Sequence, residues 1–225
     1  MRGKKFWLKV FSLILPLLAI FCMPQKNAEA NYNIGIIGIE SRVKTINLGD
    51  YTNLDDLSKD PLFYAQETFE DILTTDLPSV GLTAVDKTNY AKMARKSEAE
   101  FQRVQAQMRN AISLTDKGDT SAAVKLFEKN LDYLVYGYIA NMTITHRESL
   151  ATSTLSVRVD LTTRIIDAET GKVVCVAIGK GESKSRGGTY RKSFKFGGEE
   201  ISEECWREAL EKAIGQIVTK IKNQV

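Results

Sequence analysis

Residues 155–178 read LSVRVDLTTRIIDAETGKVVCVAI. From residue 155 to residue 165 apolar and polar residues largely alternate, and this period of two predicts a β-strand with one buried and one solvated face. Residues 167–172, DAETGK, predict a hairpin turn in which Gly171 supplies a positive φ. Residues 173–178 are expected to return as the partner strand, so the second half of the chain is predicted to be mainly sheet.

Working outward, strands are predicted at residues 132–145, in the isoleucine-rich run 33–40, and at 82–85. Apolar residues at helical spacing predict four helices, at residues 62–77, 90–111, 120–129 and 200–222. The inner stripe of the last helix begins at Trp206. We expect one α/β (α+β) domain over residues 31–225, with a mixed sheet of about five strands packed against helices.

The N-terminus has the pattern of an export signal. Residues 1–5 carry three positive charges, an apolar run follows, and Ala28-Glu29-Ala30 is the small-x-small pattern that signal peptidase reads. The apolar core is about twelve residues, shorter than the roughly twenty that a membrane span needs. Residues 1–30 are therefore predicted to be a signal peptide, and an uncleaved membrane anchor is the alternative. Phe21 precedes Cys22 where a lipidated cysteine normally follows a small residue, so lipidation is not favoured.

Composition and charge exclude several classes of protein. The 225 residues are 43% hydrophobic and 26% charged with four prolines, which excludes a disordered chain and leaves enough apolar material for a core without metal or disulfides. Five of the 31 basic side chains, but one of the 28 acidic ones, lie in residues 1–30. The mature chain is thus almost neutral, which argues against a nucleic-acid partner.

The cysteines and the single histidine do not form a recognisable site. Two cysteines, Cys175 and Cys205, remain after removal of the signal, and they form either a strand-to-helix disulfide or two small buried residues. The second reading is favoured. His146 has no surrounding catalytic motif, and Gly35-x-x-Gly38 lies inside a strand, where it cannot place a phosphate at a helix N-terminus.

A group of four glutamates has a structural explanation. The group comprises Glu199, Glu200, Glu203 and Glu204, at the predicted start of the last helix. Negative charges there are stabilised by the positive end of the helix dipole. With no motif left to carry chemistry, no enzyme activity, cofactor, metal or small-molecule substrate is expected.

A basic segment with interleaved aromatics, residues 179–198, is expected to be a loop. It is either a solvated loop or a surface that contacts a partner. Its candidate interaction residues are the three aromatics as anchors and two basic residues at the rim: Tyr190, Arg191, Phe194, Lys195 and Phe196. The polar loop near residues 50–60 is a second candidate surface.

Three blocks resemble the curli-secretion family of CsgG and its relative, the penicillin-binding-protein activator LpoB. They are IGII at residues 34–37, LDYLVYGY at 131–138 and VRVDLTTRIIDAETGKV at 157–173. The resemblance implies an exported, non-catalytic domain that acts through protein contacts, with envelope proteins or with itself, in the periplasm and in association with the outer membrane. The alternative is a subunit of an outer-membrane curli-secretion channel, although the segments at 145–154 and 179–198 are poorly suited to spanning a membrane.

The first prediction concerns processing. Cleavage after Ala30 should leave Asn31 as the mature N-terminus, because the small residues at positions 28 and 30 suit signal peptidase. Intact-mass measurement of protein from the cell envelope checks this. A mass that includes residues before Asn31, or acyl chains on Cys22, would contradict a non-lipidated secretory signal.

Overall fold

The computed structural model describes residues 31–43, 61–85, 87, 98–127, 129–148, 153–186, 193–196 and 199–224. The predicted signal peptide and the polar loop at 50–60 lie outside these residues.

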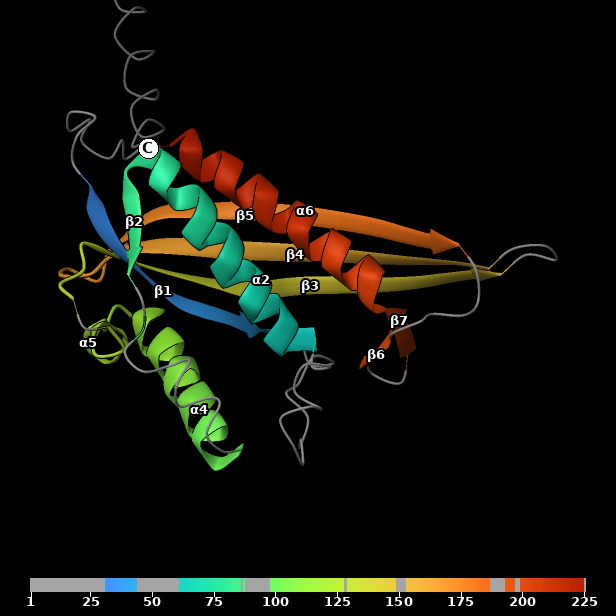
Figure 1. Cartoon of the computed structure of the whole chain (residues 1–225), viewed down its shortest axis with the longest axis horizontal. Coiled ribbons are helices and arrows are strands. Elements are labelled where there is room, and N and C mark those ends of the chain that lie inside the picture. The colour runs from blue at the N-terminus through green and yellow to red at the C-terminus, as the bar shows by residue number, and fades with distance from the viewer. Residues whose placement is uncertain are drawn as a thin grey trace, which may run out of the picture.

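A five-stranded sheet forms the centre of the molecule (Figure 1). Its order is β2-β1-β3-β4-β5, and the strands are β1 (Tyr32–Ser41), β2 (Leu82–Val85), β3 (Tyr133–Glu148), β4 (Ser153–Asp167) and β5 (Val173–Arg186). Strand β1 is parallel to both β2 and β3, whereas β3, β4 and β5 pair antiparallel. The predicted mixed sheet of five strands is confirmed, and so is the α+β class.

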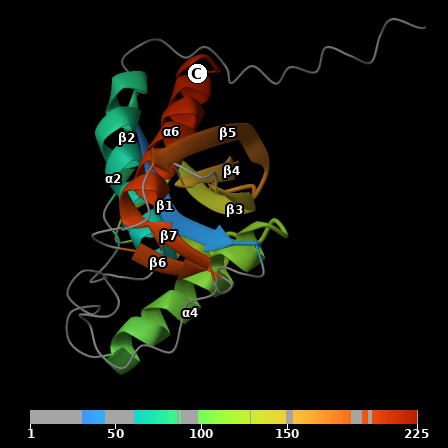
Figure 2. The ribbon, with the colours of Figure 1, turned by 90° about the vertical axis from the view of Figure 1, so that its right-hand side faces the viewer.

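The described helices are α2 (Pro61–Asp76), the 3-10 helix η1 (Leu77–Val80), α4 (Glu98–Thr115), α5 (Ser121–Val124) and α6 (Glu203–Lys222). Helices α2 and α6 lie side by side on one face of the sheet, which we call the inner face, and α4 lies on the other side near β1 (Figures 1 and 2). The larger apolar core fills the space between the inner face and α2 and α6. A smaller core joins α4 and α5 to β1, β3 and the end of β4.

Several sequence predictions about the core are confirmed. Trp206 is fully buried, and its indole nitrogen donates a hydrogen bond to the carbonyl oxygen of Pro61 at 3.2 Å. Cys175 and Cys205 are free, buried thiols, as the favoured reading expected. Gly171 has φ 69° in the turn between β4 and β5.

The predicted loop at 179–198 is wrong over all of its described residues. Strand β5 continues to Arg186, where the sequence suggested an end at residue 178, and β6 (Ser193–Phe196) pairs antiparallel with β7 (Glu199–Ser202). The inner positions in the second half of β5 are the small residues Gly179, Gly181 and Ser183, because α6 lies directly over them. This part of the strand therefore lacks the large apolar residues whose alternation would have predicted it.

Three element boundaries also differ from expectation. The helix predicted at 120–129 is one turn, Ser121–Val124, because the chain then turns and residue Phe127 forms an isolated bridge with Lys87. Helix α4 extends to Thr115, four residues beyond the predicted end, and residues 90–97 lie outside the described part. Glu199 and Glu200 belong to β7, so Glu203 and Glu204 alone occupy the first turn of α6.

Helix α6 lies in direct contact with the backbone of β5. A Cβ atom added to Gly179 would lie 1.8 Å from the carbonyl oxygen of Ala213, and one added to Gly181 would lie 1.6 Å from that of Ala209. No side chain fits in that space, so the two glycines set the distance between helix and strand.

Strand β5 is an edge strand, and side chains of α6 form hydrogen bonds with the backbone groups on its unpaired side. The amide of Lys180 donates to the Gln216 side chain at 3.0 Å, and the Lys212 ammonium group donates to the carbonyl of Glu182 at 3.1 Å. Lys220 donates likewise to the carbonyl of Ile178. Occupied groups of this kind protect an edge strand against pairing with another strand.

The second prediction tests this contact. Gly181→Ala should lower the free energy of unfolding by at least about 3 kcal/mol, the upper end of overpacking costs, because the new methyl group meets backbone atoms that cannot move aside. Gly215→Ala is the matched control. Gly215 lies exposed on α6 with nothing near its Cβ position, so alanine there should stabilise the protein by about 0.5–1 kcal/mol. Urea unfolding measures both, and a Gly181→Ala protein as stable as the wild type would contradict the close packing.

Candidate functional site

The face of β3, β4 and β5 that points away from α2 and α6 is here called the outer face. In β4 the alternation predicted from the sequence separates buried residues such as Val157 and Val159 from Arg158 and Asp160, which point outward. Among the described elements, α4 and α5 cover this face only near β1 and the start of β3, and no helix lies over its middle (Figure 2).

Four charged residues occupy the middle of the outer face. Arg158 of β4 is directly opposite Glu182 of β5, and Asp160 is opposite Lys180. We call these four residues the charge quartet. Along β4, Arg158 is followed on this face by Asp160, and along β5, Lys180 is followed by Glu182, so the sign of the charge alternates along each strand. The directly opposite pairs also have opposite signs, so the charge alternates between the strands as well.

Contacts within the monomer orient these side chains without burying them. The Arg158 Nε atom lies 3.3 Å from Asp160 Oδ1, and the Lys184 ammonium group lies 3.0 Å from Glu182 Oε1. Lys184 and a hydrogen bond from Ser156 lower the pKa of Glu182 below its ordinary value. Arg158, Lys180 and Glu182 are all exposed.

Two large apolar side chains lie beside the charge quartet. Val176 and Ile178 of β5 point outward and are 46% and 45% exposed. Their direct neighbours on β4 are Arg164 and Thr162. The outer face thus combines exposed apolar surface with ordered charges on regular strands.

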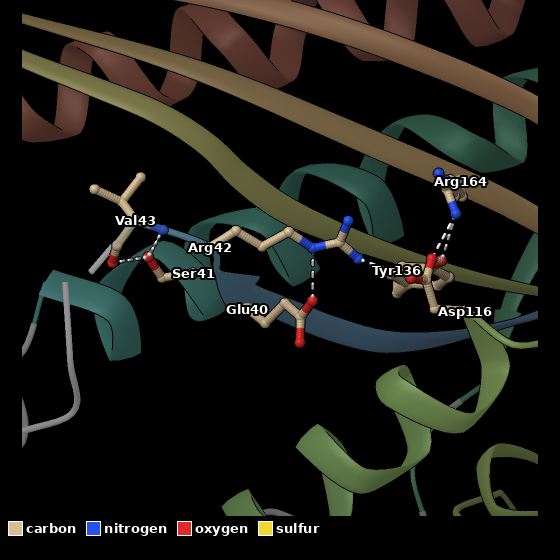
Figure 3. A network of polar contacts seen from close by, with 7 residues as sticks. All are labelled: Glu40, Ser41, Arg42, Val43, Asp116, Tyr136 and Arg164. Carbon is tan, nitrogen blue, oxygen red and sulfur yellow. Dashed lines mark hydrogen bonds and ion pairs between the residues drawn. The ribbon is translucent and has the colours of Figure 1, made fainter. Parts of the chain in front are cut away.

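A second polar cluster lies where α4 meets the outer face (Figure 3). Asp116, directly after α4, accepts hydrogen bonds on Oδ1 from the Tyr136 hydroxyl and from Arg164 Nη1, both at 2.5 Å. Its Oδ2 atom accepts from Arg42 Nη2 at 3.1 Å. One carboxylate therefore joins the residue after β1, and strands β3 and β4, to the end of α4.

The two arginines also contact an aromatic ring. The Arg42 guanidinium carbon lies 3.6 Å from the centre of the Tyr138 ring, and that of Arg164 lies 5.8 Å from it. Arg42 further pairs with Glu40 at 3.1 Å. Cations stacked on an aromatic face at these distances are attracted by its quadrupole, so the ring and Asp116 together hold both arginines in place.

Ionisation of Asp116 depends on this cluster. Partial burial disfavours the charged form, but the hydrogen bond from Tyr136 and the charges of Arg164 and Arg42 outweigh it and hold the pKa of Asp116 below its ordinary value of 3.8. Burial and the hydrogen bond to Asp116 raise the pKa of Tyr136. Both groups therefore keep their usual charge at neutral pH.

A buried polar network of a different kind joins α2 to α4. Gln66 accepts a hydrogen bond from Gln105 at 3.2 Å and donates to Glu70 at 3.2 Å. Lys87 pairs with the same Glu70 carboxylate at 2.5 Å, and burial, opposed by Glu70, lowers the pKa of Lys87. The hydrogen bond between Gln105 and Gln66 connects α4 to α2, and the ion pair of Glu70 connects α2 to Lys87. The network stabilises the packing of these segments.

No group of three or more His, Cys, Asp or Glu residues in the described ranges is placed to hold a metal ion. Within the same ranges, no helix combines the length and the apolar character needed to cross a membrane. His146 lies within β3, opposite Leu155.

The interaction residues predicted from the sequence are only partly placed. Tyr190 and Arg191 lie outside the described residues, whereas Phe194, Lys195 and Phe196 belong to β6. In the register of β6 and β7, Phe194 is opposite Ile201, which is fully buried.

Sequence reasoning missed the charge quartet as a unit. It assigned Lys180 and Glu182 to a loop, although the small-charged alternation GKGESK at residues 179–184 was a signal of strand.

No known family model matches this chain, and no curated protein does. Solved structures similar to it include the hypothetical protein CT253 from Chlamydia trachomatis, with 13% identity over 87% of this chain and 98% of that chain and a TM-score of 0.46. The lipoprotein GNA1162 from Neisseria meningitidis shares 10% identity over 86% and 96% of the two chains, with a TM-score of 0.32.

The C-terminal domain of LpoB from Salmonella enterica is similar over 72% of this chain and 90% of that domain, with 13% identity and a TM-score of 0.33. Lipoproteins and an LpoB domain are thus among the structural neighbours. TM-scores below 0.5 at these identities assign neither a family nor a function, and the resemblance to CsgG stays a prediction.

The third prediction concerns Asp116. Asp116→Asn should cost about 1–2 kcal/mol at pH 7, less than the loss of fully buried charged hydrogen bonds, because the carboxylate is partly exposed. Because the folded-state pKa is depressed, the stability that ionised Asp116 contributes is complete well above pH 3.8 and is lost as the pH falls through the folded value.

Urea unfolding of wild type and variant between pH 7 and about pH 3 measures this effect. The difference between the two proteins should shrink as the pH falls below 3.8. Glu169→Gln, at an exposed position in the turn after β4, is the control and should change little. A difference that does not vary with pH would show that the ionised carboxylate is not what stabilises this junction.

Proposed function

We propose that this chain is a non-catalytic exported protein that acts through protein–protein contacts in the periplasm. The observation that carries the proposal is the outer face. Val176 and Ile178 are almost half exposed there, directly beside the ordered charge quartet. Exposed apolar surface bordered by polar groups is typical of an interaction site, and strands hold such a site in a fixed shape.

The location rests on the sequence. The charged start, the short apolar core and the Ala28-Glu29-Ala30 pattern support export. The blocks that resemble CsgG and LpoB support a place in the cell envelope, with an envelope protein or a second copy as partner. The three blocks lie in β1, in the start of β3 and in β4 through the turn into β5, so they belong to the sheet that carries the outer face.

A second candidate surface is the segment predicted from the sequence. Tyr190, Phe194 and Phe196 are its anchor candidates, with Arg191 and Lys195 at the rim. This segment and the outer face are separate hypotheses about where the partner binds, and both can be tested in one experiment.

The fourth prediction is a cross-linking result in the native envelope. A photo-reactive phenylalanine analogue replaces Ile178 on the outer face, or Tyr190 in the second segment, and Glu169 in the exposed turn serves as the control position. We expect a discrete protein cross-link from residue 178, identified by mass spectrometry, and none from residue 169. A cross-link from residue 190 instead would move the contact surface to that segment.

Fractionation of the same cells tests location. We expect the protein in the periplasmic fraction, or released from membranes by high salt. Recovery in the cytoplasm, or no protein cross-link from either test position, would contradict the proposal. Resistance of the protein to both salt and carbonate extraction would favour the alternative of a subunit of an outer-membrane secretion channel.

A further inference from the structure

We infer that the outer face binds a second copy of the same chain, face to face, with the charge quartet of one copy against that of the other. This inference rests on the proposed interaction function and names its partner.

The charge quartet is compact. Directly opposite residues of an antiparallel pair have Cβ atoms about 4.5–5.5 Å apart. Arg158 and Glu182 are such a pair, and so are Asp160 and Lys180 in the next outward-facing row. Unlike charges are therefore neighbours along the strands and across them, and like charges lie only on the diagonals.

This arrangement is complementary to itself. A two-fold axis that runs along the strands, midway between β4 and β5 and in the plane of contact, places β4 of one copy over β5 of the other. Arg158 then meets the second copy's Glu182, and Asp160 meets the second copy's Lys180. An axis across the strands also pairs opposite signs, because it places Arg158 over Asp160.

In a two-fold interface the same surface lies on both sides, so that surface must be complementary to itself. A surface with charge of one sign would repel its own copy. The four residues thus provide charge complementarity to a second copy of this chain without any further partner.

The β5 edge of the sheet is less suitable for self-association than the outer face. Side chains of α6 form hydrogen bonds with backbone groups at the free edge of β5, and these side chains are Gln216, Lys212 and Lys220. A strand of a second copy cannot pair at this edge without displacing them. On the outer face, Val176 and Ile178 supply apolar area at one end of the charge quartet. With the axis along the strands, Ile178 and Val176 lie over the second copy's Thr162 and Arg164, so they lose exposed area without meeting one another, and the charges determine the orientation.

The experiment uses two complementary variants of the full-length chain, expressed with its own N-terminal segment and purified as the host processes it. Arg158→Glu with Lys180→Glu makes the charge quartet entirely negative. Asp160→Lys with Glu182→Lys makes it entirely positive. Sedimentation velocity over concentrations up to about 100 μM measures association of each protein alone and of an equimolar mixture.

We expect the wild type to form dimers and each variant alone to associate at least about a hundredfold more weakly, because like charges then face one another. The mixture should recover association, since a negative face meets a positive one. The control is Arg103→Glu with Arg109→Glu on α4, which changes the net charge as much as the first variant does at exposed positions outside the charge quartet. It should dimerise like the wild type.

Circular dichroism and urea unfolding establish that each variant is folded, and recovery in the mixture cannot arise from unfolded chains. A wild type that stays monomeric throughout the concentration range would overturn the inference, as would variants that dimerise normally or a mixture that stays monomeric. A monomer that still gives a cross-link from residue 178 to another protein would overturn only the self-association. Absence of any protein cross-link would overturn the proposed function as well.

Discussion

The contact between α6 and the glycines of β5 determines which surfaces of the sheet are left for other molecules. Because Gly179 and Gly181 carry no side chain, the helix lies against the strand backbone and covers the inner face up to its edge. The same closeness lets side chains of α6 reach the outward backbone groups of β5. Both the inner face and the β5 edge are thereby occupied within the monomer, whereas no helix among the described elements covers the middle of the outer face.

The part of the fold that local pattern determines could be predicted from the sequence. In the middle of β4 the inward positions are large apolar residues except Thr163, and most outward positions are polar, so period and register were both visible. In the second half of β5 the inward positions are Gly179, Gly181 and Ser183, and their size is set by a helix about thirty residues further along the chain. Hydrophobic alternation is absent there, and composition alone suggested a loop.

The polar cluster around Asp116 was invisible to sequence reasoning for a different reason. Its members come from four segments, and the hydrogen bonds of Asp116 to Arg42, Tyr136 and Arg164 join residues 74, 20 and 48 positions apart. No short motif encodes such a group. It forms because the pairing of β3 with β4 brings Tyr136 opposite Arg164 and because α4 ends beside them.

The two polar groups of the outer face differ in what their charges can do. In the Asp116 cluster one carboxylate binds two arginines and a hydroxyl, and an aromatic ring covers the first arginine, so the charges stabilise the monomer. In the charge quartet the side chains lie on two neighbouring strands, and Arg158, Lys180 and Glu182 stay exposed. The alternating signs of these four side chains sum to zero, which avoids repulsion among them while the chain is monomeric. The same alternation makes the outer face of one copy complementary in charge to that of a second copy. The arrangement that avoids repulsion within the monomer therefore also permits face-to-face association.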